Sequence, residues 1–188
     1  MIGFRPKLTD KYVALIVQKY GGTSVGSTER IAQVAERVAG YLARGHQVAV
    51  VVSAMSGETN RLVAMGHELG GPAASRREMD VLTSSGEQVT IALLSIALLQ
   101  RGVAAKSFLA DQIALHTDGA HGRARIERID TEALRSEIAA GVVPVIAGVP
   151  GVNDRGGITT LGRGGSATSA VRLAAGPEAD GCAAFTRR

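Results

Sequence analysis

Short, continuous apolar runs alternate with amphipathic stretches along this 188-residue chain. Runs of this kind are typical of strands buried on both faces, as in a parallel sheet covered by helices. They predict strands at residues 13–17, 48–52, 104–109, 142–147 and 181–186. Apolar positions at helical spacing predict helices at residues 28–43, 61–69, 87–100, 130–139 and 164–175. Alternating strands and helices with right-handed crossovers predict an α/β fold, a three-layer α/β/α sandwich with a mainly parallel sheet.

The segments between these elements are less regular. Residues 70–77 predict a loop or a short excursion, residues 148–157 are rich in turn formers, and residues 1–12 predict a loose segment. The polar stretch 111–125 predicts either a loop over a site or a small hairpin. Lys19, Ser53 and Gly148 all fall at the carboxyl ends of predicted strands. Since ligands bind at that edge of open parallel sheets, we expect the functional site there.

Composition narrows the classes of partner. The net charge is +4, but the basic residues are scattered, and aromatic residues are only 3% of the chain. This argues against nucleic-acid binding, which needs a basic stripe or stacking aromatics, whereas a small anionic substrate fits. No apolar run reaches the roughly 18 residues of a membrane span, and no secretory signal pattern is seen, so no membrane partner is expected. The single cysteine, Cys182, lies in an apolar stretch and predicts a core thiol in a reducing, cytoplasmic setting.

The first candidate for chemistry is the run from Lys19 to Ser24, Lys-Tyr-Gly-Gly-Thr-Ser, which joins the first strand to the first helix. Glycines let backbone N–H groups turn toward an anion, a helix N-terminus adds positive potential, and a lysine adds a full charge. The run is neither a P-loop nor a G-x-G-x-x-G turn. We interpret it as a phosphate-binding turn; the alternative is a tight strand-to-helix turn with one surface lysine. The four histidines show no metal-ligand spacing and predict structural or solvated side chains.

Together with three later segments in the same order, residues 53–60, 84–88 and 158–166, this run resembles the signature blocks of aspartokinases in the amino-acid-kinase superfamily. The resemblance extends from about residue 13 to about residue 186. It implies ATP-dependent phosphorylation of the side-chain carboxylate of L-aspartate to 4-phospho-L-aspartate, for lysine, threonine and methionine biosynthesis. Mg²⁺ would accompany ATP, with no protein metal ligand identified. A kinase acting on glutamate, acetylglutamate or a nucleotide is a further alternative, which the opening run disfavours.

The resemblance also assigns roles to residues. It implies that Lys19 is the catalytic residue and contacts phosphate. Three residues would bind aspartate: Thr59, Glu87 and Arg163. Six would bind phosphate or nucleotide with Lys19: Gly21, Gly22, Ser24, Gly164, Gly165 and Ser166. From the residues alone, Glu87 could instead be a carboxylate at a helix start that complements the helix dipole, and Arg163 a solvated loop arginine.

Two features depart from the family pattern. Ala167 stands where the family has an aspartate considered catalytic, and segments that help bind nucleotide do not follow residue 186. We therefore expect residues 13–188 to be a partial amino-acid-kinase catalytic domain, incomplete at its C-terminus and without a C-terminal regulatory domain. The alternative function is a catalytically inactive aspartate-binding fragment or partner subunit. A homo-oligomer is also among the expectations.

Overall fold

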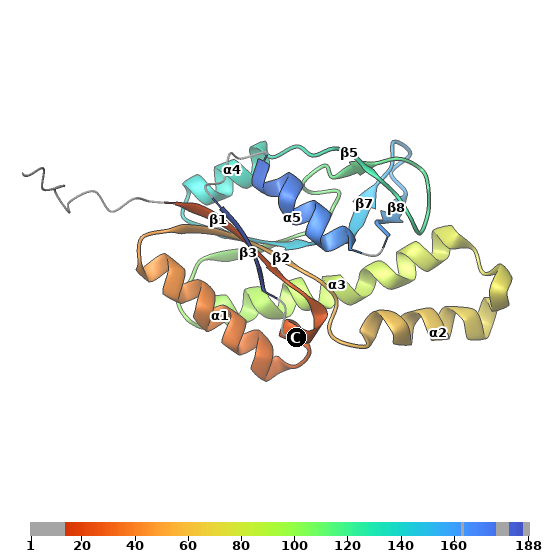
Figure 1. The fold of residues 1–188 in the computed structure, drawn as a ribbon, viewed down its shortest axis with the longest axis horizontal. Coiled ribbons are helices and arrows are strands. Elements are labelled where there is room, and N and C mark those ends of the chain that lie inside the picture. The colour runs from red at the N-terminus through yellow and green to blue at the C-terminus, as the bar shows by residue number, and fades with distance from the viewer. Residues whose placement is uncertain (1–13, 163, 176–180, 186–188) are drawn as a thin grey trace, which may run out of the picture.

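The computed structural model describes residues 14–162, 164–175 and 181–185 (Figure 1). The expectations for residues 1–12 and for Arg163 lie outside these residues. Within them, a five-stranded sheet has the order β3-β6-β2-β1-β9, and each strand pairing is parallel. Its strands are β1 (Leu15–Tyr20), β2 (Gln47–Val52), β3 (Ala105–Phe108), β6 (Val143–Ala147) and β9 (Gly181–Phe185). The five predicted strands are therefore confirmed, with small shifts at their ends.

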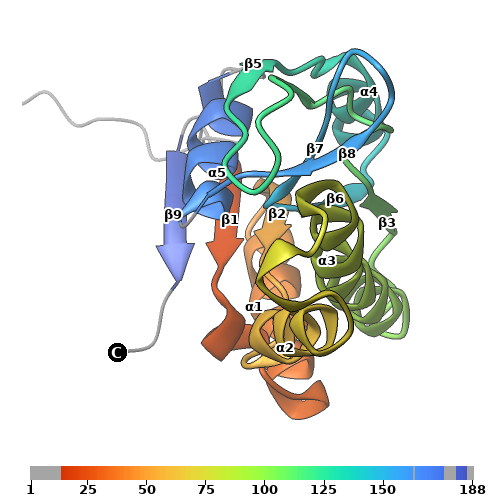
Figure 2. The same ribbon diagram turned by 90° about the vertical axis from the view of Figure 1, so that its right-hand side faces the viewer.

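Helices cover both faces of this sheet (Figures 1 and 2). One layer holds α1 (Thr28–Ala43) and α3 (Arg76–Leu99), and the other holds α4 (Glu132–Ala139) and α5 (Gly165–Ala175). Side chains alternate along β2, so that Val48, Val50 and Val52 pack toward α1 and α3, whereas Ala49 and Val51 pack toward α4 and α5. Each face thus buries its own apolar core, and the predicted three-layer sandwich is confirmed.

A second, four-stranded sheet has the order β5-β4-β7-β8 and lies against α3 (Figure 2). Its strands are β4 (His116–Thr117), β5 (Ile126–Arg128), β7 (Pro150–Val152) and β8 (Ile158–Thr160). The small hairpin considered for residues 111–125 is partly right, because β4 lies there and pairs antiparallel with β5. The β7–β8 hairpin was not predicted, since the Gly, Pro, Asn and Asp residues of this region are typical of turns.

Helix α3 begins at Arg76, eleven residues before the predicted start at Glu87. The short 3₁₀ helix η2 (Gly71–Ala73) and α2 (Glu58–Gly70) precede it, and α2 packs along α3. The first turns of α3 escaped prediction because their buried face is polar, with Asp80 and Ser84 buried there. Among the described helices, α3 is long and apolar enough by composition to cross a membrane. Its contacts with both sheets and with α1 and α2 make it a core helix here.

One expectation from the sequence is wrong. Cys182 is exposed and not a core thiol. It lies on β9, which is the edge strand of the described sheet and pairs only with β1. A strand with a neighbour on one side leaves part of its surface uncovered, so an apolar run there does not guarantee burial.

Candidate substrate and phosphate site

A cavity of about 960 Å³ opens at the carboxyl ends of β1, β2 and β6, where the sequence predicts the site. Its walls come from the turn after β1, the loop after β2, α2, the N-terminal half of α3, residues 121–123, the β7–β8 hairpin and the start of α5. One face of α3 supplies a whole wall, with residues at spacings of three and four: Arg76, Met79, Asp80, Thr83, Ser84 and Glu87. Eleven residues of helix extend about 16 Å, so the cavity is long enough for more than one ligand group.

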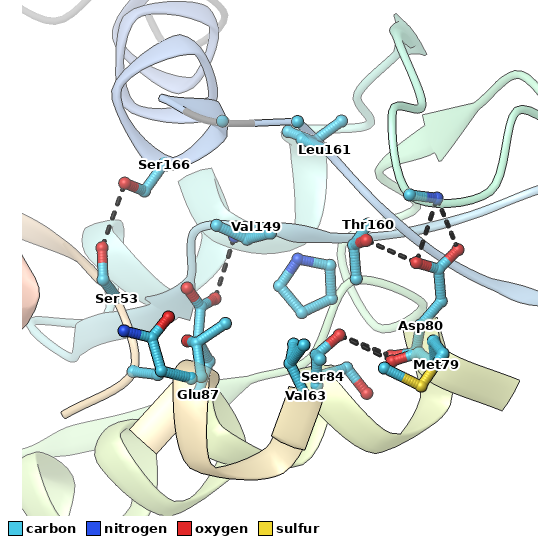
Figure 3. Close-up of a pocket in the computed structure, with 18 of the residues that line it drawn as sticks. Ser53, Val63, Met79, Asp80, Ser84, Glu87, Val149, Thr160, Leu161 and Ser166 are labelled. Carbon is cyan, nitrogen blue, oxygen red and sulfur yellow. Dashed lines mark hydrogen bonds between the residues drawn. The ribbon is translucent and has the colours of Figure 1, made fainter. Parts of the chain in front are cut away.

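Glu87 carries the most perturbed carboxylate of the cavity. Glu87 is only 3% exposed, and its Oε2 accepts a hydrogen bond of 2.9 Å from the Val149 N–H (Figure 3). Burial raises its pKa to about 7, while hydrogen bonds from the backbone amides of Val149, Gly148 and Ala54, together with the charge of Lys19, hold the pKa down. Glu87 lies in the middle of α3, so the alternative of a helix-start carboxylate is wrong.

The predicted phosphate turn folds as the short 3₁₀ helix η1 (Gly22–Val25) between β1 and α1. Gly21 and Gly22 line the cavity, and Gly22 approaches the loop after β2 closely. A Cβ placed on Gly22 would lie 2.8 Å from the carbonyl oxygen of Ala54, closer than real Cβ atoms come. A glycine is therefore required here for the turn to lie against its neighbour.

Ser24 and Lys19, unlike Gly21 and Gly22, are not among the described residues that line the larger cavity. The Ser24 hydroxyl donates to the Phe185 carbonyl at 3.1 Å, and Ser24 lines a second cavity of about 190 Å³ with Arg30 and Arg37. Lys19 is partly buried near the end of β1 and is not among the described residues that line the larger cavity. Its charge nevertheless acts on Glu87, so the two side chains belong to one electrostatic environment.

The start of α5 closes the cavity from the other side. Gly164, Gly165 and Ser166 all line it, as does Thr59 from the first turn of α2. The Ser53 hydroxyl donates to Oγ of Ser166 at 3.0 Å, which joins the loop after β2 to α5 (Figure 3). The Gly165 N–H donates to the Gly162 carbonyl at 2.9 Å and is engaged within the chain.

Gly148, directly after β6, allows this closure. A Cβ placed on it would lie 2.7 Å from the Ser166 Cβ and 2.9 Å from a methyl of Val51. Only glycine lets the end of β6, the end of β2 and the start of α5 approach one another so closely. The sequence predicted that Gly148 lies at the site edge, and the structure confirms this placement.

The sequence did not reveal Asp80 or its partners. Asp80 is 2% exposed and binds His121, Gly122 and Thr160, from two segments far away in the sequence. Asp80 precedes Glu87 by seven residues, or two helical turns, so an extended α3 would have placed both on one face. His121, expected to be structural or solvated, has a structural contact with Asp80 at 2.7 Å.

The described residues offer no metal cage of their own. Among them there is no group of three or more His, Cys, Asp or Glu side chains able to hold a metal ion. The two buried carboxylates of the cavity, Asp80 and Glu87, already accept hydrogen bonds from protein donors. The side chains of the described residues therefore do not form a protein binding site for Mg²⁺.

Comparison with known proteins shows the family of the chain. The sequence profile of the amino acid kinase family matches residues 14–187. The chain belongs to the amino acid kinase family. It is 55% identical to the aspartokinase of Pseudomonas aeruginosa over 174 residues and 49% identical to that of Thermus thermophilus. Each alignment covers 93% of this chain but only 42% and 43% of the relative, so the chain spans less than half the length of these proteins.

Solved structures agree on the fold. The chain resembles the aspartate kinase from Synechocystis with a TM-score of 0.80 and 44% identity, over 93% of this chain and 28% of that one. It also resembles aspartokinase III of E. coli, solved in complex with aspartate and ADP, with a TM-score of 0.82. The second likeness has 24% identity and covers 92% of this chain and 49% of that one, so it shows the fold alone.

Proposed function

We propose that this chain is part of the catalytic domain of a cytoplasmic aspartate kinase, which phosphorylates the side-chain carboxylate of L-aspartate with ATP to give 4-phospho-L-aspartate. The product would enter lysine, threonine and methionine biosynthesis. The observation that carries the proposal is the buried carboxylate of Glu87, which faces a cavity beside a glycine-rich turn. The identity of about half of the aligned residues to aspartokinases supports it.

The proposed substrate, L-aspartate, has one ammonium group and two carboxylate groups. The proposed binding residues are a carboxylate for the first, and a hydroxyl and a guanidinium for the others. Glu87 would bind the α-ammonium group, because its carboxylate is held in place by backbone amides and faces the cavity. Thr59, exposed in the first turn of α2, would donate its hydroxyl to a carboxylate oxygen. Arg163 would bind a carboxylate with two parallel N–H groups.

Phosphoryl transfer between two anions depends on positioning and on charge neutralisation. ATP, accompanied by Mg²⁺, would be the donor. The segments Gly21–Ser24 and Gly164–Ser166 would hold its phosphates through those backbone N–H groups that are not bonded within the chain, unlike the N–H groups of Ser24 and Gly165. Both segments lie at helix starts, and two glycines of each line the cavity. Lys19 would contribute a positive charge to the phosphates. It lies near the end of β1 and outside the described cavity lining, and its effect on the pKa of Glu87 supports an electrostatic link to the proposed acceptor site.

A second candidate function follows from Ala167. This residue is exposed in the first turn of α5, and its methyl group cannot supply the charge of the aspartate that the family pattern has there. The chain could then bind aspartate without phosphorylating it.

Two assays on one preparation separate these functions. The first is ATP-dependent formation of aspartyl hydroxamate, and the second is calorimetric titration with L-aspartate. Turnover with binding supports the kinase, and binding without turnover supports the aspartate-binding subunit. The absence of both overturns the proposal that this chain contains the aspartate site.

A further inference from the structure

Asp80 joins three parts of the cavity wall. From the second turn of α3, its Oδ2 contacts Nδ1 of His121 at 2.7 Å, and both of its carboxylate oxygens accept the Gly122 N–H at 3.1 Å. The Thr160 hydroxyl, at the end of β8, donates to Oδ1 (Figure 3). These donors satisfy a carboxylate that is 2% exposed. The proposed reaction makes no direct use of it.

The contacts around Asp80 fix the backbone of Arg123, which lies between Gly122 and Ala124. Gly122 is bound to Asp80, and the Ala124 N–H donates to the Thr160 carbonyl at 3.0 Å. Ala124 also forms a parallel bridge with Leu161, so residues 122–124 and 160–162 run side by side. A Cβ placed on Gly162 would lie 3.9 Å from the Cα of Arg123. The backbone of Arg123 is therefore held on both sides, and this residue is one of those that line the cavity.

Backbone hydrogen bonds connect the segment of Arg123 to the proposed ammonium site. The Leu161 N–H donates to the Val149 carbonyl at 2.9 Å, and the Val149 N–H in turn donates to Glu87. A short path of hydrogen bonds thus leads from Glu87 through Val149 and Leu161 to the neighbour of Arg123. Arg76, the other arginine of the wall, lies about 16 Å along α3 from Glu87, too far for one small ligand to contact both residues.

The charge of Arg123 is available to a ligand. Within the described ranges, no carboxylate pairs with its guanidinium, while the nearby carboxylates of Asp80 and Glu87 are occupied by other donors. A guanidinium without a carboxylate partner offers a planar pair of donors that matches a carboxylate, and Arg123 is one of the residues that line the cavity.

We propose that Arg123 binds a carboxylate of a short α-amino dicarboxylate in this cavity, and that Asp80 is the positioning residue that holds Arg123 there. The inference rests on the proposed function, since the ligand is the proposed acceptor L-aspartate. It adds to the proposed aspartate ligands one arginine from the segment between β4 and β5, and a residue that acts only through that arginine.

The test begins with calorimetric titration of the unaltered chain with L-aspartate. If the unaltered chain does not bind it, the proposed function fails before this inference is tested. If it binds, Arg123→Gln should weaken binding roughly tenfold to a hundredfold, the range for a charge-assisted pair. Arg125→Gln is the matched control, because it removes the same charge from the same segment, and Arg125 does not line the cavity. Equal affinities for Arg123→Gln and Arg125→Gln would overturn the inference.

Two mono-amides identify the carboxylate. L-Asparagine lacks the side-chain carboxylate and L-isoasparagine lacks the α-carboxylate. The loss caused by Arg123→Gln should disappear with one of these ligands and persist with the other. The same loss with both would mean that Arg123 acts through long-range charge and not through a contact.

A double-mutant cycle tests the positioning role of Asp80. Asp80→Asn should weaken binding of L-aspartate, and the double variant Asp80→Asn/Arg123→Gln should bind no more weakly than Arg123→Gln alone. Additive losses would show that Asp80 does not act through Arg123. If thermal unfolding shows that Asp80→Asn does not fold, Thr160→Val replaces it in the cycle, because it removes one donor to Asp80 and keeps the side-chain shape.

Discussion

The binding of L-aspartate should depend on pH through Glu87. Burial raises the pKa of Glu87 to about 7, whereas the ammonium group of aspartate stays charged well above that pH. Only the ionised carboxylate attracts the ammonium, so binding must shift Glu87 toward its ionised form. Glu87 is about nine-tenths ionised at pH 8 and about one-tenth ionised at pH 6. The affinity should therefore fall about tenfold, or about 1.4 kcal/mol, between these two pH values.

The assay is calorimetric titration at pH 6, 7 and 8 in pairs of buffers with different heats of ionisation. The release of about 0.9 proton per bound aspartate is expected at pH 6, and of about 0.1 proton at pH 8. Glu87→Gln should bind more weakly at every pH and lose this proton release.

Two results would refute this reasoning. Equal affinity at pH 6 and pH 8 without proton release would show that the carboxylate of Glu87 interacts only with the backbone amides around it. Proton release that persists in Glu87→Gln would assign the titration to another group. In either case Glu87 would be a structural link between α3 and the ends of β2 and β6, and the proposed ammonium site would have to lie elsewhere in the cavity.

Four further outcomes are expected. The folded-state pKa of Glu87 lies above its usual value of 4.5, so the contribution of this group to the unfolding free energy should be largest below pH 4.5. It should fall by about 3 kcal/mol as the pH rises to 7. Urea unfolding should show this pH dependence in the unaltered chain and not in Glu87→Gln. Lys19→Ala should weaken triphosphate binding in titrations while changing the unfolding free energy by no more than about 0.5 kcal/mol, and a variant that unfolds readily would make Lys19 structural. Gly22→Ala should destabilise the chain by about 1–3 kcal/mol, because its methyl group would meet a backbone carbonyl at 2.8 Å, whereas Gly119→Ala, which meets nothing within 4 Å, should unfold like the unaltered chain. Ala167→Asp should stabilise the chain by about 0.3–1 kcal/mol in thermal unfolding, because a negative charge in the first turn of α5 complements the helix dipole; a lower melting temperature would contradict this.

The sequence by itself determined the elements whose signal is local. The predicted helix 28–43 coincides with α1, because Ile31, Val34 and Val38 repeat at helical spacing and pack on a single core. The apolar runs of β2 and β6 predicted buried parallel strands, since only strands covered on both faces are apolar throughout. From the predicted parallel strands alone, Lys19, Ser53 and Gly148 could be placed at one edge of the sheet, because the carboxyl ends of parallel strands lie together.

Only the tertiary structure decided what lies opposite those strand ends. The first turns of α3 look irregular in sequence because the buried side chains of Asp80 and Ser84 are polar, and a periodicity of apolar residues cannot report a face that binds polar partners. The partners of Asp80 lie about 40 and 80 residues further along the chain, and no local pattern encodes such contacts. The raised pKa of Glu87 likewise follows from burial, which exists only once α3, β2 and β6 have packed together. The sequence thus determines the residue types of the site and the edge of the sheet at which the site lies. The packing of distant segments determines the pKa of Glu87 and the partners of Asp80.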